Sequence, residues 1–429
     1  MVAAALFIIF FVLVILNVPI ALSLAASATA AVYFFTDIEA YVVIQRFFGN
    51  CDVFSMMAIP FFMIAGGLMA HGGVSKRLTN FANSIVGSLP GGLAIVAILA
   101  SLFFGALSGS STATVAAIGS IMVPAMLEAG YGLPFSLATV ATAGFLGVII
   151  PPSIPMVNYG VSTNTSVGDM FMAGFLPGIL LALGMCVIAV IYGKRHVPVT
   201  TKFEWHNVWV TFKDAFWALL MPVIILGGIY GGVFSATESA CIATFYGLIV
   251  GCFVYKELKL KDIKDILVSS VTSTAMIMFI VAAAGAFGFV MTRENIPTQV
   301  AQWILSVSSS KWVFLLLVNT LLLVVGTFME TNAAIIILAP ILMPVVHQFN
   351  IDPVHFGIVM IVNLAIGMIT PPLGVNLYVA AGLKEGVKVD QVINKHLIIY
   401  MLAMIGVLLI LTFVPGISTL IPSLLATKN

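Results

Sequence analysis

Charged residues are scarce in this chain. They make up 8% of its 429 residues, whereas 61% belong to the set Ala, Val, Ile, Leu, Met, Phe, Trp, Tyr and Cys. Soluble proteins carry roughly 25% charged residues, because a solvated surface must cover the core. So few charges exclude a soluble enzyme, a disordered chain and a nucleic-acid binder. The composition predicts an integral membrane protein.

The chain has few cysteines and a net charge close to zero. The four cysteines form no C-x-x-C pair, which argues against a disulfide scaffold and a thiolate metal site. The net charge of +1 offers no general attraction to an acidic partner. Residues 1–36 carry no charge at all, so the start lacks the basic region of a cleavable signal. We interpret it as a membrane segment.

Charge-free runs long enough to cross a bilayer fill most of the chain. A membrane helix needs about 20 apolar residues. The runs cover 1–36, 53–75, 78–127, 129–168, 170–193, 215–237, 266–292, 312–329, 353–383 and 397–427. The alternating pattern of a membrane barrel is absent. We therefore predict an all-α polytopic membrane protein with roughly a dozen membrane segments.

A repeated motif divides the chain in two. The sequence G-V-I-I-P-P at 147–152 returns as G-M-I-T-P-P at 367–372, and Pro124 and Pro344 have the same offset of 220 residues. A shared spacing of this kind indicates a duplicated unit, which is typical of secondary transporters.

The two copies carry opposite loop charges. The loop 37–52 has one Lys or Arg, whereas its counterpart 256–265 has four. Because cytoplasmic loops collect Lys and Arg, the copies are predicted to lie upside down relative to each other. Residues 1–193 and 215–429 are then two inverted-topology repeats, joined by a polar cytoplasmic linker at 194–214.

The loop orientation also predicts hairpins and broken helices. Residues 92–127 and 313–346 must begin and end on the same side of the membrane, so we predict a re-entrant helical hairpin in each. Residues 134–163 and 355–383 each cross once and contain a Pro-Pro pair, which predicts two broken helices.

Polar residues concentrate at the hairpin tips and helix breaks. The first tip is G-A-L-S-G-S-S-T at 105–112, and the second is G-T-F-M-E-T-N-A at 326–333. Hydroxyls, amide oxygens and freed backbone carbonyls at membrane depth are suited to Na⁺, and helix N-termini favour an anion. One hairpin tip together with one helix break predicts a cation site. Because the chain contains two copies of this unit, we predict two cation sites. Clusters of small residues can simply allow helices to pack closely, and a Pro-Pro pair can simply kink a helix. Because both features occur together in each copy, we favour a role in transport.

Two acids lie within apolar sequence, where no basic residue can pair with them. An isolated carboxylate in a membrane is costly, so Glu330 at the second tip is predicted to be functional. Glu238, in S-A-T-E-S-A, is interpreted as a structural hydrogen-bonding group. Asn158, Asn363 and Asn376 flank the broken helices and either orient a polar substrate or join helices.

Three motifs carry a family resemblance. The runs G-A-L-S-G-S-S-T-A-T-V-A-A-I-G at 105–119, G-F-L-G-V-I-I-P-P-S-I-P at 144–155 and G-M-I-T-P-P-L-G-V-N at 367–376 resemble the large membrane subunit of tripartite ATP-independent periplasmic (TRAP) transporters. The resemblance covers essentially the whole chain. It implies the ion transporter superfamily, the bacterial inner membrane, and sodium-driven uptake of an organic acid by an elevator movement. It also implies two partners, a small four-helix membrane subunit and a periplasmic substrate-binding protein.

The resemblance further implies where two sodium ions and the substrate bind. The first sodium site comprises Ser108, Gly109, Ser110, Gly147, Val148 and Pro151. The second comprises Thr327, Glu330, Thr331, Asn332, Gly367, Thr370 and Pro371. The substrate lies closest to Ser110, Ser111, Thr331 and Asn332, with Asn158 and Asn376 as further candidates. Glu330 stands where the first tip has Ser110, so the two sites are not strictly equivalent. No cofactor other than the coupling ion is expected.

The sequence lacks the residues and motifs that other functions would require. An intramembrane serine protease built on the Ser-Gly-Ser cluster needs a general base, and we place all six histidines in or beside loops. The motifs H-E-x-x-H and G-x-x-x-x-G-K-[ST] are absent, so a zinc protease and an ATPase are disfavoured. We therefore predict a transporter subunit and not an enzyme. The closest alternative is a passive permease of an ATP-driven importer, which needs no paired cation sites. A C4-dicarboxylate, a sugar acid and sialic acid all remain open as substrates.

Overall fold

The computed structural model describes residues 1–197, 202–307 and 310–426, and the elements within them are helical. They are α1 (Val2–Ile15), α2 (Ile20–Phe35), α3 (Tyr41–Gly49), η1 (Phe54–Met57), α4 (Ala58–His71), α5 (Val74–Val86), α6 (Gly92–Ser108), α7 (Ser111–Glu128), α8 (Leu133–Gly144), η2 (Phe145–Val148), α9 (Ile154–Thr163), α10 (Val167–His196), α11 (Trp205–Tyr230), α12 (Ala236–Ile249), η3 (Val250–Val254), α13 (Leu260–Arg293), α14 (Ile296–Val307), α15 (Lys311–Phe328), α16 (Thr331–Gln348), α17 (Pro353–Gly367), α18 (Val375–Ala381), α19 (Val389–Val392), α20 (Lys395–Phe413) and α21 (Gly416–Ala426).

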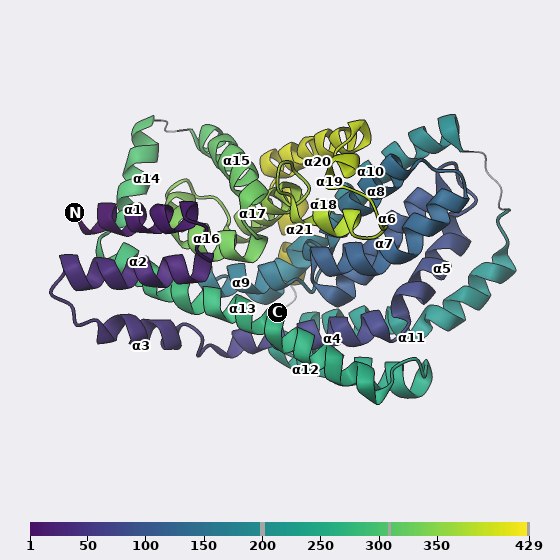
Figure 1. The fold of residues 1–429 in the computed structure, drawn as a ribbon, viewed down its shortest axis with the longest axis horizontal. Coiled ribbons are helices and arrows are strands. Elements are labelled where there is room, and N and C mark those ends of the chain that lie inside the picture. The colour runs from purple at the N-terminus through teal and green to yellow at the C-terminus, as the bar shows by residue number, and fades with distance from the viewer. Residues whose placement is uncertain (198–201, 308–309, 427–429) are drawn as a thin grey trace.

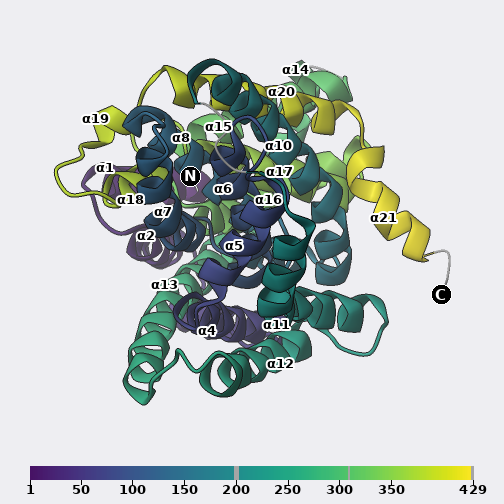
Figure 2. The same cartoon turned by 90° about the vertical axis from the view of Figure 1, so that its right-hand side faces the viewer.

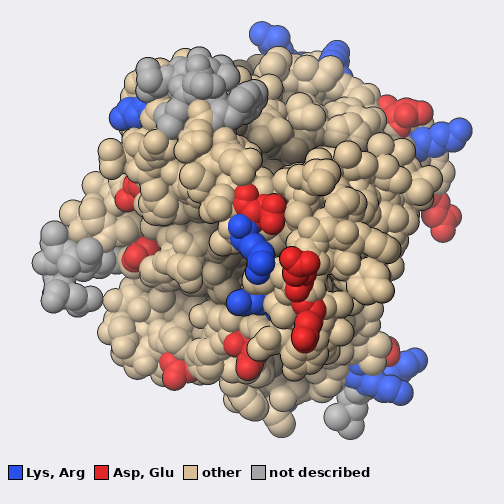
Figure 3. Space-filling model, turned by 90° about the vertical axis from the view of Figure 1, so that its left-hand side faces the viewer, with Lys and Arg blue, Asp and Glu red and all other residues tan. Residues whose placement is uncertain are grey.

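The prediction of an all-helical polytopic membrane protein is confirmed. In the described part of the chain, nine helical segments are long and apolar enough to cross a membrane, and five apolar helices are shorter. Large apolar side chains face outward from several of them, for example Val187 and Val223. The view in Figure 3 shows a mostly uncharged face on which the few charged side chains gather in a short band and at the edges. Lipid tails, unlike water, solvate such a surface without cost.

The N-terminal charge-free run differs from a single membrane segment. It forms two short helices, α1 and α2, which pack against each other. Asn17 adopts a positive φ of 63° and Pro19 lies just before the first residue of α2, so the helix cannot continue through residues 16–19. The length of the charge-free run 1–36 therefore did not show that the helix is interrupted at residues 16–19.

The helices form two groups that are visible in two views. Helices α4, α11, α12 and α13 lie together along the lower side of Figures 1 and 2, and α4 packs against both α12 and α13. The other group contains α6–α10 and α15–α20 above them. Helix α5 contacts both groups, because it packs against α11 on one side and α6 on the other.

Elements from the two halves of the chain interlock within the upper group. Helix α9 packs against α16, and α18 packs against α7 and α8. The helix after each Pro-Pro pair therefore contacts the helix that follows the tip in the other half. This arrangement brings the polar residues singled out in the sequence together.

The predicted linker 194–214 is partly helical. Helix α10 continues to His196 and α11 begins at Trp205, while residues 198–201 lie outside the described residues. The first turns of α11 carry exposed Trp205 and Trp209, and the ammonium of Lys213 lies 5.4 Å from the Trp209 ring centre. Tryptophan and lysine together are typical of the membrane–water interface.

Candidate functional site

The first tip is a tight turn between α6 and α7. Gly109 has a φ of 58°, a left-handed conformation that ends α6 at little cost for glycine, and Ser110 caps α7. The Ser108 hydroxyl lies 3.0 Å from the Thr114 hydroxyl, and Thr114 donates to the carbonyl oxygen of Ser110 at 2.8 Å. Thr114, one helical turn after Ser110, was not singled out in the sequence, although its spacing of four residues could have indicated it.

The second tip is capped by a carboxylate. Glu330 precedes α16 and accepts hydrogen bonds from the backbone N–H groups of Asn332 (2.9 Å) and Ala333 (3.3 Å) and from Nδ2 of Asn332 (2.7 Å). These three donors and the helix N-terminus offset part of the cost of placing a carboxylate in a buried position. The neighbouring Thr331 is fully buried, and its Oγ1 has no hydrogen-bond partner among the described residues.

Each tip is held by an asparagine from the other half of the chain. Nδ2 of Asn376, on α18, donates to Oγ of Ser111 at 2.7 Å and to the carbonyl oxygen of Ala141 at 3.2 Å. Nδ2 of Asn158, on α9, donates to Oδ1 of Asn332 at 2.7 Å. Both asparagines are fully buried, so these bonds form in a medium of low dielectric constant.

The helix breaks coincide with the Pro-Pro pairs. After η2 the chain is non-helical until α9 begins at Ile154, and after α17 it is non-helical until α18 begins at Val375. Both Pro-Pro peptide bonds are cis. The carbonyl oxygen of Val148 accepts a hydrogen bond from the Ser153 hydroxyl at 2.6 Å, and that of Ile366 accepts one from the Thr370 hydroxyl at 2.8 Å.

Paired glycines bring each tip helix onto a break. A methyl group added at Gly105 would lie 2.8 Å from Cα of Gly147, and one added at Gly326 would lie 3.1 Å from Cα of Gly367. Backbones approach this closely only where side chains are absent. The same contact therefore occurs in both halves, between the first tip helix and the glycine four residues before the Pro-Pro pair.

The predicted first set of residues is brought together. A methyl group at Gly147 would lie 2.6 Å from the Ser110 carbonyl oxygen, and one at Gly109 would lie 2.9 Å from the Pro152 carbonyl oxygen. Of the second set, Gly367 lies against Gly326 of the tip helix, and the Thr327 hydroxyl donates to the carbonyl oxygen of Val324 in its own helix at 2.7 Å.

Two of the polar residues that the sequence analysis singled out have structural roles. Asn363 donates to Oδ1 of Asn319 at 2.7 Å, and Asn319 donates to the Thr412 hydroxyl at 2.9 Å, so these residues join α15, α17 and α20. Glu238 forms a capping box with Ser235 at the start of α12, with an N–H to carboxylate distance of 2.8 Å. The structural role predicted for Glu238 is confirmed.

One histidine lies deeper than the sequence indicated. His355 follows a loop, but it is buried in the first turn of α17, because Asp352 caps this helix ahead of the expected boundary. The prediction that the spans lack histidine was wrong at this position. Nδ1 of His355 lies 2.8 Å from the Ser418 hydroxyl, whereas the Ser108 and Ser111 hydroxyls pair with Thr114 and Asn376. Within the described ranges, the Ser108 and Ser111 hydroxyls therefore have no hydrogen bond to a histidine.

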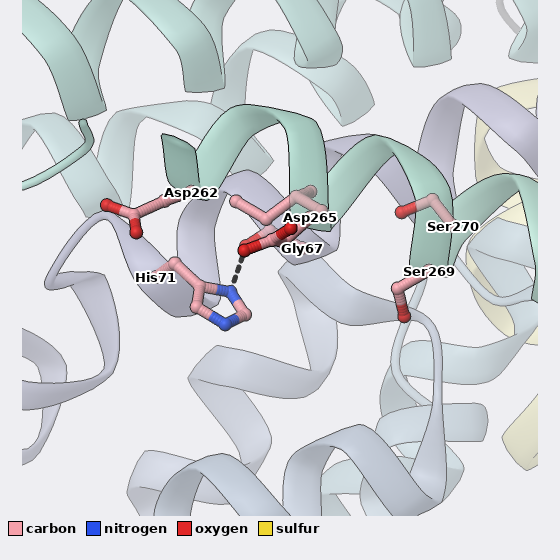
Figure 4. A pocket seen from close by; sticks show the side chains of 7 residues that line it. Gly67, His71, Asp262, Asp265, Ser269 and Ser270 are labelled. Carbon is pink, nitrogen blue, oxygen red and sulfur yellow. Dashed lines mark hydrogen bonds between the residues drawn. The ribbon is translucent and has the colours of Figure 1, made fainter. Parts of the chain in front are cut away.

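A cavity of about 400 Å³ lies away from the tips, between α4 and the first turns of α13. Figure 4 shows the His71 ring beside the Gly67 carbonyl oxygen, which lies 3.0 Å from Nδ1, with Asp262 and Asp265 on the facing helix. Asp262 accepts a hydrogen bond from the backbone N–H of Lys259 at 2.9 Å. Over the described ranges, no group of three His, Cys, Asp or Glu side chains could hold a metal ion.

Comparison with known proteins decides the family. Residues 7–417 match the sequence model described as "Tripartite ATP-independent periplasmic transporter, DctM component". The chain belongs to this family. The resemblance inferred from the motifs is confirmed, and the protein is a TRAP transporter large membrane subunit, a multi-pass protein of the bacterial inner membrane and not an enzyme.

Several relatives are named for the substrate that they transport. The chain is 46% identical over 414 residues to the isethionate TRAP transporter permease protein DctMQ of Oleidesulfovibrio alaskensis, covering 95% of this chain but only 64% of that longer protein. It is 40% identical to the C4-dicarboxylate TRAP transporter large permease protein DctM of Rhodobacter capsulatus, covering 96% and 97% of the two chains. It is 38% identical to the sialic acid TRAP transporter large permease protein SiaM of Vibrio cholerae, covering 85% and 86%.

Two solved transporters share the fold. The Alcanivorax borkumensis YdaH transporter superposes with a TM-score of 0.64 at 16% identity, covering 96% of this chain and 98% of that one. Neisseria gonorrhoeae MtrF superposes with a TM-score of 0.59 at 12% identity, covering 93% of both chains.

Proposed function

We propose that this TRAP permease imports an organic acid anion and couples its movement to sodium ions. The observation that carries the proposal is the crossed pair of bonds, in which Asn376 holds the first tip and Asn158 holds the second. Each tip is thus joined to the helix that follows a break in the other half. In transporters, interrupted helices at membrane depth supply ion and substrate sites, because their backbone groups are free to bind.

The oxygen atoms around the two tips support sodium as the coupling ion. Na⁺ is a hard cation, and hydroxyl, carbonyl and carboxylate oxygens are its preferred ligands. We assign one ion to Ser108, Gly109, Ser110, Gly147, Val148 and Pro151. We assign the other to Thr327, Glu330, Thr331, Asn332, Gly367, Thr370 and Pro371. The buried hydroxyl of Thr331, which has no hydrogen-bond partner among the residues that the structure describes, supports the second assignment, since an orphaned polar atom costs free energy.

The named substrates of the relatives support an organic anion as cargo. Isethionate, C4-dicarboxylates and sialic acid all carry a negative charge. The Ser110 hydroxyl caps α7 with a long bond of 3.5 Å to the N–H of Ala113, so the first turn of α7 keeps donors for an anionic group. We place the substrate beside Ser110, Ser111, Thr331 and Asn332, with Asn158 and Asn376 positioning the tips.

The same proposal includes the architecture and the partners. Residues 1–193 and 215–429 are inverted repeats, and 92–127 and 313–346 are hairpins that each open to one face of the membrane. The body that carries the tips moves as an elevator against the remaining helices. A small membrane subunit and a periplasmic binding protein complete the transporter; the family description, which names a tripartite system, supports them.

Uptake into proteoliposomes tests the proposal. Liposomes containing this chain and its small subunit, supplied with the binding protein and its ligand, should accumulate that ligand only under an inward sodium gradient and without ATP. Equal uptake under a potassium gradient would contradict sodium coupling and favour the passive permease.

A matched pair of variants links this activity to the first tip. Thr114→Val removes the hydroxyl that bonds to Ser108 and Ser110, and we expect a lower apparent affinity for Na⁺. Ser120→Ala is the control, because its exposed hydroxyl donates only to Ala117 of the same helix, at 3.0 Å. Similar sodium dependence in both variants would remove the first tip from the mechanism.

A further inference from the structure

Arg77 is the centre of the ion pairs in the described part of the chain. Its Nη1 lies 2.6 Å from Oε1 of Glu257, and its Nε lies 3.2 Å from Oδ1 of Asp214. Nη1 also donates to the carbonyl oxygen of Gly73 at 3.0 Å. Its side chain is 16% exposed, whereas those of Asp214 and Glu257 are 54% and 41% exposed. One cation from the first half of the chain therefore bridges a carboxylate at the end of the linker, Asp214, and one in the second half, Glu257.

Tyr255 completes this cluster. The guanidinium carbon of Arg77 lies 3.8 Å from the centre of the Tyr255 ring, which is a cation–π contact. The Tyr255 hydroxyl donates to the carbonyl oxygen of Asp214 at 2.9 Å and accepts from the N–H of Ala218 at 3.1 Å. The ring is thus fixed to the backbone of α11, so the cation is held by α11 and by residues 255–257 together.

The corner that precedes Arg77 is shaped around the cluster. Gly73 has a φ of 75°, and a methyl group added there would collide with the side chains of Glu257 and Arg77. The left-handed conformation therefore favours a glycine at this position, and a larger residue would also displace the ends of these two side chains.

The cluster lies where the first tip helix is connected to the rest of the protein. Helix α5 begins just after Gly73 and leads through a short turn into α6, which ends at the first tip. Figure 2 shows α5 beside α11, and a second contact between them joins the hydroxyls of Ser84 and Thr211 at 2.8 Å. The chain therefore passes from the lower group of helices to the first tip through α5, and α6 also packs directly on α4.

We infer that Arg77 is a positioning residue for transport, which locks α5 onto α11 and residues 255–257 so that α5 stays stationary while the first tip moves. This inference rests on the proposed function. Arginine suits the role because its planar fork can bond two carboxylates and stack on a ring at once, which a lysine ammonium cannot do. Without the cation, two carboxylates would repel each other at the same contact.

Cysteine cross-linking tests whether α5 stays on α11. Ser84→Cys and Thr211→Cys are combined in a chain whose four native cysteines are replaced by serine, and disulfide formation is followed as the loss of reaction with a maleimide-polyethylene glycol. We expect rapid, complete oxidation and unchanged sodium-driven uptake after it. If oxidation abolishes uptake and a reductant restores it, α5 moves against α11 and the inference is overturned.

Substitution of Arg77 in the same double-cysteine chain tests the lock itself. Arg77→Met should slow disulfide formation and lower uptake by roughly three- to tenfold, as the loss of two partly exposed ion pairs and a stacked cation allows. Arg77→Lys should lie in between. Lys76→Met is the matched control, because it removes an adjacent, exposed cation and should leave both rates unchanged. An unchanged cross-linking rate in Arg77→Met would also overturn the inference.

Two further measurements distinguish the loss of the lock from misfolding of Arg77→Met, and failure of this inference from failure of the proposed function. Asp214→Asn combined with Glu257→Gln removes the carboxylates and retains Arg77, so it should match Arg77→Met in cross-linking rate even if Arg77→Met folds poorly; a parental rate would refute the lock. The cross-linking rate needs no transport. If the parent chain shows no sodium-driven uptake, the proposed function fails, and the rate still reports on Arg77.

Discussion

Nδ2 of Asn158 lies 2.7 Å from Oδ1 of Asn332, and Asn332 in turn donates from its own Nδ2 to Glu330 at 2.7 Å. A single chain of hydrogen bonds therefore connects the helix after the first Pro-Pro pair with the carboxylate that caps the second tip. Because each amide is oriented by its neighbour, the carboxylate of Glu330 is held in one position relative to the first half of the protein.

Asn158→Leu should uncouple the second tip from α9. The substitution leaves Oδ1 of Asn332 buried without a donor, which costs about 1–3 kcal/mol of stability. We expect the KM for substrate to rise and sodium-driven uptake to fall. Asn363→Leu is the comparison, since it breaks a buried bond of the same length to Asn319 outside the tips. It should lower the thermal unfolding temperature by a similar amount and leave the KM unchanged; equal KM effects would contradict the assignment.

Gly147→Ala should abolish uptake through a steric effect. The added methyl group would lie 2.6 Å from the carbonyl oxygen of Ser110, so the first tip would be displaced from the break. Gly406→Ala is the control, because nothing lies within 4 Å of a methyl group at that position in α20. Replacing a helical glycine by alanine in open space stabilises by about 0.5–1 kcal/mol. Uptake assays and thermal unfolding should therefore give opposite results for the two alanines. Normal uptake by Gly147→Ala would show that the tip tolerates displacement.

Glu330→Gln should change transport, whereas Glu238→Gln should not. Both carboxylates accept backbone hydrogen bonds at a helix start, so each substitution replaces a carboxylate cap by a neutral amide. Only Glu330 belongs to the proposed second sodium site. Measuring uptake against sodium concentration should show a weaker sodium dependence for Glu330→Gln alone. Identical curves for both variants would limit Glu330 to capping.

Thr331→Val separates a ligand role from a packing role. The Thr331 hydroxyl is buried and has no partner in the part of the chain that the structure describes, so an isosteric valine should leave stability unchanged or raise it. If this hydroxyl binds sodium, the sodium concentration for half-maximal uptake should rise several-fold. Ser111→Ala provides the contrast, since it loses a bond to Asn376 and should lower stability as well. An unaltered sodium requirement in Thr331→Val would exclude this oxygen as a ligand.

The sequence was sufficient to predict much of this fold. Low charge predicted the membrane helices, and the recurrence of Pro-Pro at an offset of 220 residues predicted both helix breaks. Loop orientation predicted the two tips, and in the structure Gly109 ends α6 and Glu330 caps α16, as their residue types favour. These signals are local, so a single sequence contains them.

Contacts between distant segments could not be predicted in the same way. Asn158 and Asn376 were candidates for orienting the substrate, yet they bond to Asn332 and Ser111, which lie 174 and 265 residues away in the chain. Spacing within one half says nothing about which partner in the other half an amide will meet. The cluster around Arg77 was missed for the same reason, since its carboxylates come from α11 and from the segment after η3.

The exchange of partners between halves has a consequence for biogenesis. When α7 and α9 are inserted by the translocation machinery, Asn376 and Asn332 have not yet been synthesised, so the bonds that Ser111 and Asn158 make to them cannot yet form. Neither tip can acquire its native bonds until the last third of the polypeptide has left the ribosome. Nascent chains truncated before α18 should accordingly be substrates for membrane proteolysis, and completion of the two tips is a late event shared by both.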